Sequence, residues 1–258
     1  MRNMTPVVSF VLLLILGNSA SAQILWDGGG RDDLWSTAAN WSLDTIPTRV
    51  DAASIDQPAN AHCIIQDGIA AACETLRVGN AGVTTYLDIR GGSLSASGAY
   101  IGVDDVGGHG ILNMSGGLFS TGSLQIGWRG TGTLNMTGGV IELSDDLIVP
   151  GLTGTGAVKL RGGTIHASAL QLTSASGSLD VAAGTLILAG DDTAAVQAYN
   201  DNGWITGYGY NSDGGQAAFL LTPIPEPASL SLLALGAAVA ALGSRWLRVA
   251  LRAIANSR

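Results

Sequence analysis

The segment LNMSGG at residues 112–117 returns as LNMTGG at residues 134–139, and this repeat decides the fold. Related segments begin at Leu87, at Val158 and, in degenerate form, at Leu179. The first residues of these five segments are 25, 22, 24 and 21 positions apart, a period typical of stacked solenoid coils. The sequence therefore predicts a chain that winds about five times around one elongated core.

Each copy contains three short segments in which apolar and polar residues alternate, the pattern of β-strands that bury one face. The inward residues of the first segments are Leu87 and Ile89, Leu112 and Met114, Leu134 and Met136, Val158 and Leu160, and Leu179 and Val181. The second inward set begins with Leu94, Phe119, Ile141, Ile165 and Leu186, and the third with Leu76, Ala99, Leu124, Leu147 and Leu170.

Gly-Gly pairs follow the first segment of the copies, at a corner that needs a positive φ or a close backbone approach. Asn113 and Asn135 hold equivalent outward positions one coil apart, so we expect their side chains to stack. Regular registry over five copies favours an all-β, right-handed single-stranded β-helix of about five coils. A β-sandwich is the alternative.

The solenoid needs closed ends, because open strand edges invite aggregation. We expect residues 61–190 to form the β-helix, with an N-terminal cap at 23–60 and a C-terminal cap at 191–222. Trp26, Trp35 and Trp41 would pack in the first cap. The second would hold a short helix from Asp192 and a hairpin that pairs 204–210 with 217–222.

The N-terminus has the features of a signal peptide over residues 1–22. Arg2 precedes an apolar run at 7–16, and Ala20-Ser21-Ala22 fits an A-x-A cleavage site, so the mature chain would begin at Gln23. A membrane-spanning helix is the alternative, but the run is about half of the ~20 residues that a bilayer requires.

The C-terminal segment, residues 223–258, contains Pro225-Glu226-Pro227, then an uncharged apolar stretch, then basic residues. Its predicted membrane-anchoring residues are Leu230, Leu232, Leu233, Leu235, Arg245 and Arg248. The stretch predicts a hydrophobic helix of about 24 Å with its arginines on the cytoplasmic side.

This order of parts resembles a PEP-CTERM sorting signal, although the chain continues to Arg258 instead of ending in a short arginine cluster. The resemblance implies an exosortase-type protease as partner, cleavage near Pro225–Pro227, and delivery to the cell surface or exopolysaccharide matrix of a Gram-negative-type bacterium. A plain C-terminal membrane anchor is the alternative. The Gly-Gly coils and the segment before them resemble the β-helical passenger repeats of autotransporter-type surface proteins.

Charge excludes nucleic acid as a partner. Five of the 12 basic residues and one of the 20 acidic residues lie in the terminal segments, which leaves seven basic against 19 acidic residues and a net charge of −12 between residues 23 and 224. Such a body repels a phosphate backbone, whose binding depends on clustered Lys and Arg.

Cys63 and Cys73 are the only cysteines. In an exported chain they either form a disulfide or remain as two buried thiols. His62 is the one imidazole near them, so no ligand set for a metal ion is complete, and we expect no metal and no cofactor.

No pattern of catalytic residues emerges from the sequence. The acidic pairs 104–105 and 145–146 fall at different corners of their coils, so they do not form a carboxylate pair across a cleft. Trp128 lies in a turn and is a candidate for stacking on sugars. We therefore expect a non-catalytic, structural or adhesive protein of the cell surface or extracellular matrix. A β-helical polysaccharide-binding or polysaccharide-degrading protein is the alternative.

Overall fold

The computed structural model describes residues 22–80, 82–103, 107–189, 192–206, 209–212 and 219–222, the last two ranges by their backbone. Ala22 is exposed directly before the first strand. The signal peptide with Ala20, the motif at 225–227 and the anchor residues of the C-terminal segment lie outside the described residues. Within the described ranges, no helix is both long enough and apolar enough to cross a membrane.

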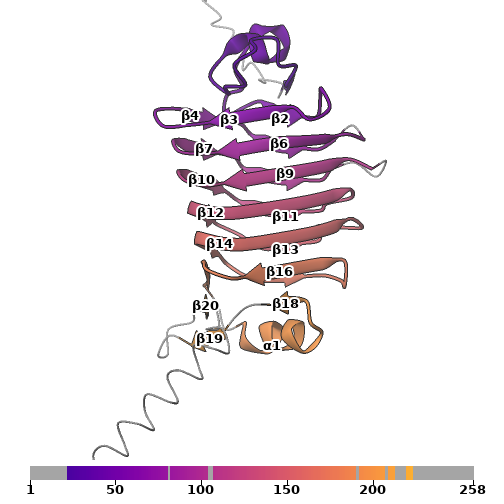
Figure 1. The fold of residues 1–258 in the computed structure, drawn as a ribbon, viewed down its shortest axis with the longest axis vertical. Coiled ribbons are helices and arrows are strands. Elements are labelled where there is room, and N and C mark those ends of the chain that lie inside the picture. The colour runs from indigo at the N-terminus through magenta and orange to yellow at the C-terminus, as the bar shows by residue number, and fades with distance from the viewer. Residues whose placement is uncertain are drawn as a thin grey trace, which may run out of the picture.

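The chain forms a stack of parallel β-coils with three walls (Figure 1). The third wall is a seven-stranded sheet of β1 (Gln23–Leu25), β2 (Ala52–Ile55), β5 (Thr75–Val78), β8 (Gly98–Ile101), β11 (Ser123–Ile126), β13 (Leu147–Val149) and β15 (Leu170–Leu172). A 13-stranded sheet supplies the other two walls.

The first wall contains β3 (His62–Ile65), β6 (Thr84–Ile89), β9 (His109–Met114), the beginnings of β12 (Thr131–Leu143) and β14 (Thr155–Ala167), β16 (Gly177–Val181) and β18 (Ile205–Thr206). The second wall contains β4 (Ala70–Ala72), β7 (Ser93–Ser95), β10 (Leu118–Thr121), the ends of β12 and β14, and β17 (Thr185–Leu188). Strands β12 and β14 run through the corner between these walls, and their pairing shifts register at Met136–Thr137.

The prediction of a parallel β-solenoid is confirmed, but the number of coils is about six and not five. The additional coil is β3, β4 and β5. Cys63 and Ile65 pair in register with Leu87 and Ile89 of the next coil. The predicted range 61–190 includes this coil, but the count was too low because the coil lacks the Gly-Gly signature. Gly68 alone adopts the positive φ of 82° after its first strand.

The predicted inward columns form one continuous core. All of the first-segment residues are at most 1 % exposed, and Phe119, Ile141, Ile165 and Leu186 of the second segments are fully buried. The corner glycines explain the sharp bend between the walls: the second glycine of each pair has a positive φ, for example 78° at Gly117. A Cβ atom there would lie 2.6 Å from the carbonyl oxygen of Gly91 in the preceding coil, so only glycine fits.

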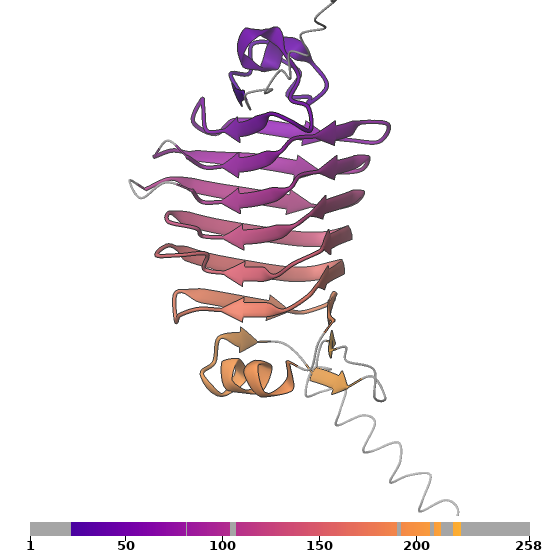
Figure 2. The ribbon, with the colours of Figure 1, turned by 180° about the vertical axis from the view of Figure 1, so that it is seen from behind.

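The N-terminal cap contains the predicted aromatic plug. Trp26, Trp35 and Trp41 are each at most 1 % exposed, and Trp41 Nε1 donates a hydrogen bond of 2.8 Å to the carbonyl oxygen of Trp35. The boundary at residue 60 is corrected, because β1 and β2 already belong to the third wall. The short 3-10 helices at Ala38–Asn40 and Ser42–Asp44 close the end of the stack (Figure 2).

The C-terminal end is closed by α1 (Thr193–Asp201), whose Val196 is buried against the core. The predicted hairpin is partly wrong. Ile205 pairs in parallel with Leu179, because it continues an inward apolar column, so β18 adds a strand to the first wall. The antiparallel pair is β19 (Gly209–Ser212) with β20 (Phe219–Thr222), and β20 also pairs with β17.

Candidate functional site

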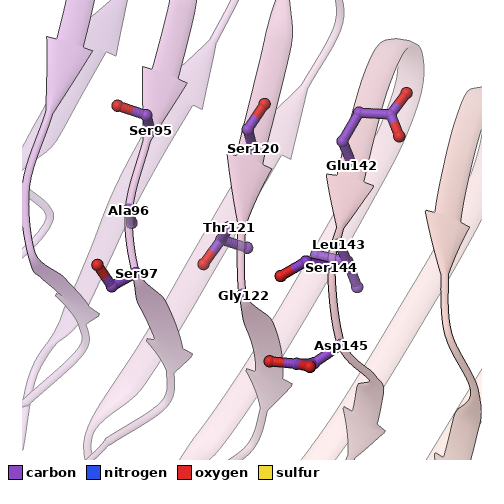
Figure 3. A pocket seen from close by; sticks show the side chains of 10 residues that line it. All are labelled: Ser95, Ala96, Ser97, Ser120, Thr121, Gly122, Glu142, Leu143, Ser144 and Asp145. Carbon is purple, nitrogen blue, oxygen red and sulfur yellow. The ribbon is translucent and has the colours of Figure 1, made fainter.

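A groove of about 670 Å³ crosses three successive coils where the second wall meets the third (Figure 3). Most of the side chains at this corner are short or polar, and Leu143 is the one large apolar residue among those that line the groove. The lining residues are Ser95, Ala96 and Ser97 from the first of these coils, Ser120, Thr121 and Gly122 from the second, and Glu142, Leu143, Ser144 and Asp145 from the third.

Strand register places the groove side chains in rows. Ser120 is paired with Ser95 on one side and with Glu142 on the other, so these three side chains form one outward row on the second wall. The backbone at the corner is hydrogen-bonded along the stack: the Gly122 N–H donates to Ser97 O at 3.1 Å, and the Asp145 N–H donates to Gly122 O at 2.9 Å. The groove is therefore a rigid part of the solenoid.

Several polar side chains of the groove are available for a ligand. Among the described residues, none makes a hydrogen bond with the hydroxyl groups of Ser95, Ser97 or Ser120 or with the Asp145 carboxylate. Glu142 is exposed, and its Oε1 atom lies 3.8 Å from His166 Nε2. Hydroxyl and carboxylate groups at such positions form hydrogen bonds with water or with a polar ligand.

A smaller hollow of about 210 Å³ adjoins the groove toward the N-terminal end, because both are lined by residues 95–97. Arg49 and Cys73 complete its lining. The groove with this hollow extends over the corners of four coils, and its two carboxylates lie at the end farther from Arg49.

The outer face of the first wall has a different character. Asp88 is only 6 % exposed and accepts hydrogen bonds from Asn113 Nδ2 at 2.7 Å and from Arg90 at 3.0 Å. His62 Nδ1 lies 3.0 Å from the same carboxylate. Asn135 Nδ2 donates to Asn113 Oδ1 at 2.9 Å, which confirms the predicted stacking of the two asparagines. We call Asp88, Asn113 and Asn135 with their partners the ladder face.

The ladder controls the ionisation of Asp88. Burial by itself raises the pKa of this carboxyl group, but the hydrogen bonds from Asn113, His62 and Arg90 outweigh it and hold the pKa below its usual value. His62 also stacks on Tyr86, with ring centroids 4.3 Å apart and an interplanar angle of 2°. The polar groups of this face therefore stabilise one another.

Cys63 and Cys73 are free thiols, which is the second of the two alternatives that the sequence left open. Both are buried. Cys63 lies in β3 of the first wall, and Cys73 lies at the corner between β4 and β5. Burial, followed by the charges of Asp88 and Asp33, raises the pKa of Cys63, and burial raises the pKa of Cys73 to about 12. Neither thiol is a reactive nucleophile in this environment.

Of the remaining acidic candidates, Asp32 and Asp146 lie far apart and do not form a common site. Asp32 fixes the cap, because Thr37 and the Leu34 N–H donate to its carboxylate, and these bonds lower its pKa. Asp146 accepts a hydrogen bond from Gln171 on the neighbouring coil, whereas the pair at 104–105 lies outside the described residues. In the described ranges, no group of three or more His, Cys, Asp or Glu side chains is placed to hold a metal ion.

Sequence reasoning missed the groove. Ser95, Ser97 and Ser120 resemble ordinary turn residues, and only the registry of the coils brings them into rows. The available signal was the alignment of short polar residues at one corner in consecutive copies. Comparisons of this chain with protein-family models, with curated proteins and with solved structures found no match.

Proposed function

We propose that this chain is a non-catalytic, exported protein of the bacterial cell surface or extracellular matrix, with a structural or adhesive role. A right-handed, elongated solenoid capped at both ends suits a spacer or a display scaffold, because its strand edges are covered. The A-x-A site before Gln23 and the PEP-CTERM-like segment after residue 222 support export and sorting by an exosortase-type protease. The hydrophobic helix expected there would anchor the chain in the membrane until cleavage.

The groove supports contact with extracellular polysaccharide as the adhesive activity. The observation that carries this part is the set of serine hydroxyl groups without partners among the described residues, which lie on two adjacent coils in a row that Glu142 continues on the third. Rows of hydroxyl and carboxylate groups suit an extended ligand with many hydroxyl groups, since each group offers a donor or an acceptor. The net charge of −12 argues against a nucleic acid in the same groove.

Polysaccharide degradation is the second candidate, because Glu142 and Asp145 lie in the same groove. Glycoside hydrolases use two carboxyl groups, of which the general acid is held protonated by an apolar pocket. Glu142 and Asp145 are both exposed, which favours binding without cleavage. Release of reducing sugars that stops in both Glu142→Gln and Asp145→Asn would overturn the non-catalytic proposal.

The direct test of export and sorting is the intact mass of the native protein in each fraction of its producing cells. We expect a species that begins near Gln23 and ends near Pro227, at the surface or in the extracellular matrix. A membrane-bound species that retains Arg258 would overturn the exosortase proposal and leave a permanent anchor. A species that begins at Met1 in the cytosol would overturn export itself.

A further inference from the structure

Two aromatic rings meet on the outer face of the third wall, whose strands begin directly after the groove residues. Tyr100 is the third residue of β8, and Trp128 lies in the turn directly after β11. Their ring centroids are 5.2 Å apart, the interplanar angle is 59°, and both side chains are half-buried. The two rings are therefore tilted against each other and remain partly exposed at the protein surface. We call this ring pair the aromatic corner.

Gly98 allows the Tyr100 ring to lie along its own strand. A Cβ atom on Gly98 would lie 3.7 Å from Tyr100 Cε2 and 3.8 Å from the Tyr100 hydroxyl oxygen. The residues in register with Gly98 on the neighbouring strands are Thr75 and Ser123, which do carry side chains. The Tyr100 ring therefore lies over Gly98. A Cβ atom alone would make ordinary van der Waals contact with the ring, whereas a larger side chain would extend into the space that the ring occupies.

Trp128 is fixed in its orientation by the neighbouring residues. The guanidinium carbon of Arg129 lies 4.7 Å from the centroid of the indole ring. On the next coil, a Cβ atom on Gly151 would lie 3.0 Å from Trp128 Cδ1, so the ring packs closely over that glycine. A ring held in this way loses little conformational entropy when a ligand binds.

Polar groups continue from the aromatic corner into the groove. Ser97, which lines the groove, directly precedes Gly98. Gln125 is in register with Tyr100 on the same face, and its amide oxygen points to Gly151 of the next coil, where a Cβ atom would lie 2.8 Å from it. A sugar ring has an apolar face of C–H groups and a rim of hydroxyl groups, so it matches an aromatic face bordered by an amide and hydroxyl groups.

We propose that Tyr100 and Trp128 form a stacking subsite for one sugar ring of a polysaccharide chain that extends from the groove. This inference rests on the polysaccharide contact of the proposed function. Tyr100 provides the surface on which the ring stacks, Trp128 bounds it at one end, and Gln125 with Ser97 binds the hydroxyl rim.

Affinity electrophoresis of the full chain tests the subsite, with hydroxyethyl cellulose, xylan, soluble starch and the exopolysaccharide of the producing cells as probes. We expect at least one probe to retard the protein. Tyr100→Ala and Trp128→Ala should each raise Kd for that probe about fivefold, because stacking contributes on the order of 1 kcal/mol and 1.4 kcal/mol corresponds to a factor of ten. Gly98→Val should have a similar effect, since it keeps both rings but fills the space under Tyr100.

Tyr86→Ala is the matched control, because it removes an aromatic side chain from the distant first wall and should leave Kd unchanged. Unaltered circular dichroism would show that each variant folds. If Ser120→Ala weakens binding but the Gly98 and Trp128 variants do not, the aromatic subsite is wrong and the groove contact stands. If no probe retards the protein, both are wrong, whereas export is decided separately by the mass in each cell fraction.

Discussion

The ladder face and the groove both carry rows of polar side chains on the same coils, but these side chains have different partners. On the ladder face, Asp88 receives three partners from within the protein and Asn135 bonds to Asn113. In the groove, the hydroxyl groups of Ser95, Ser97 and Ser120 have no such partner in the described part of the chain. A row of polar side chains therefore stabilises the solenoid where its members form hydrogen bonds with one another. Where they form none, the row offers a binding surface.

The largest expected effect on the free energy of unfolding comes from a substitution in the core beneath the groove. Phe119 is fully buried between Leu94 and Ile141, its register partners. Phe119→Ala should lower the free energy of unfolding by about 3–5 kcal/mol, because it removes a large buried side chain and leaves a cavity. Urea denaturation followed by circular dichroism measures this. Leu118→Ala, which changes an exposed neighbour on the same strand, should stay within about 0.5 kcal/mol of wild type.

Removal of one carboxylate from each surface tests directly whether the two surfaces differ in their contribution to stability. Asp88→Ala should lower the free energy of unfolding by about 1–3 kcal/mol, since Asn113 and Arg90 lose their acceptor in a part-buried site. Asp145→Ala in the groove should change it by less than about 0.5 kcal/mol. Equal losses in the two variants, again from urea denaturation, would contradict the distinction between the surfaces.

Stability should also depend on the charge of Asp88. The pKa of this group is lowered in the folded protein, so its contribution is fully present above the unfolded value near ~3.9 and is lost as pH falls through the lower folded value. The difference in urea midpoint between wild type and Asp88→Asn should therefore shrink on acidification below about pH 4. A difference that is constant from pH 7 to pH 2 would refute the role of the carboxylate charge.

Asn135, at the end of the ladder, should contribute less to the free energy of unfolding than Asp88. Asn135→Ala removes one hydrogen bond of 2.9 Å to Asn113 and should destabilise the protein by about 1 kcal/mol. In a double-mutant cycle with Asn113→Ala, the two losses should not add, because both variants remove the same bond. Strict additivity would show that the asparagines do not interact.

The smallest effect on stability is expected in the groove itself. Ser120→Ala should leave the free energy of unfolding within about 0.5 kcal/mol of wild type. The same change should weaken binding of a retained polysaccharide about two- to tenfold, which corresponds to the loss of one hydrogen bond. Affinity electrophoresis gives the second quantity. A stable variant with unchanged affinity would remove Ser120 from the binding surface.

Much of the fold follows from the sequence, because a strand that buries one face alternates apolar and polar residues, and this alternation is visible in the sequence. Leu112 and Leu134 fall in one column for this reason, and the asparagines beside them fall in another. The coil at 62–78 was harder to detect, since its corner has Gly68 in place of the Gly-Gly pair. Likewise, Ile205 looked like part of a hairpin and instead continued the column of Leu179.

The groove was not predictable in the same way. A serine at a corner contributes little to a hydrophobic pattern, so its position is decided by the registry of the coils and not by its own preference. Glu142 illustrates this: it is one residue of a strand in the sequence, but pairing with Ser120 places it in the groove wall. The structure divides the acidic pair at 145–146 between the groove and a hydrogen bond with Gln171.

Amide hydrogen exchange of the mature protein, with and without exopolysaccharide from its producing cells, shows whether polysaccharide binds in the groove and leaves the ladder face free. We expect slower exchange in the presence of polysaccharide at residues 95–98, 120–123 and 142–146. The ladder strands at 84–89 and 109–114 should exchange equally with and without it. Protection of the ladder strands without protection of the groove, or no protection anywhere, would contradict the account.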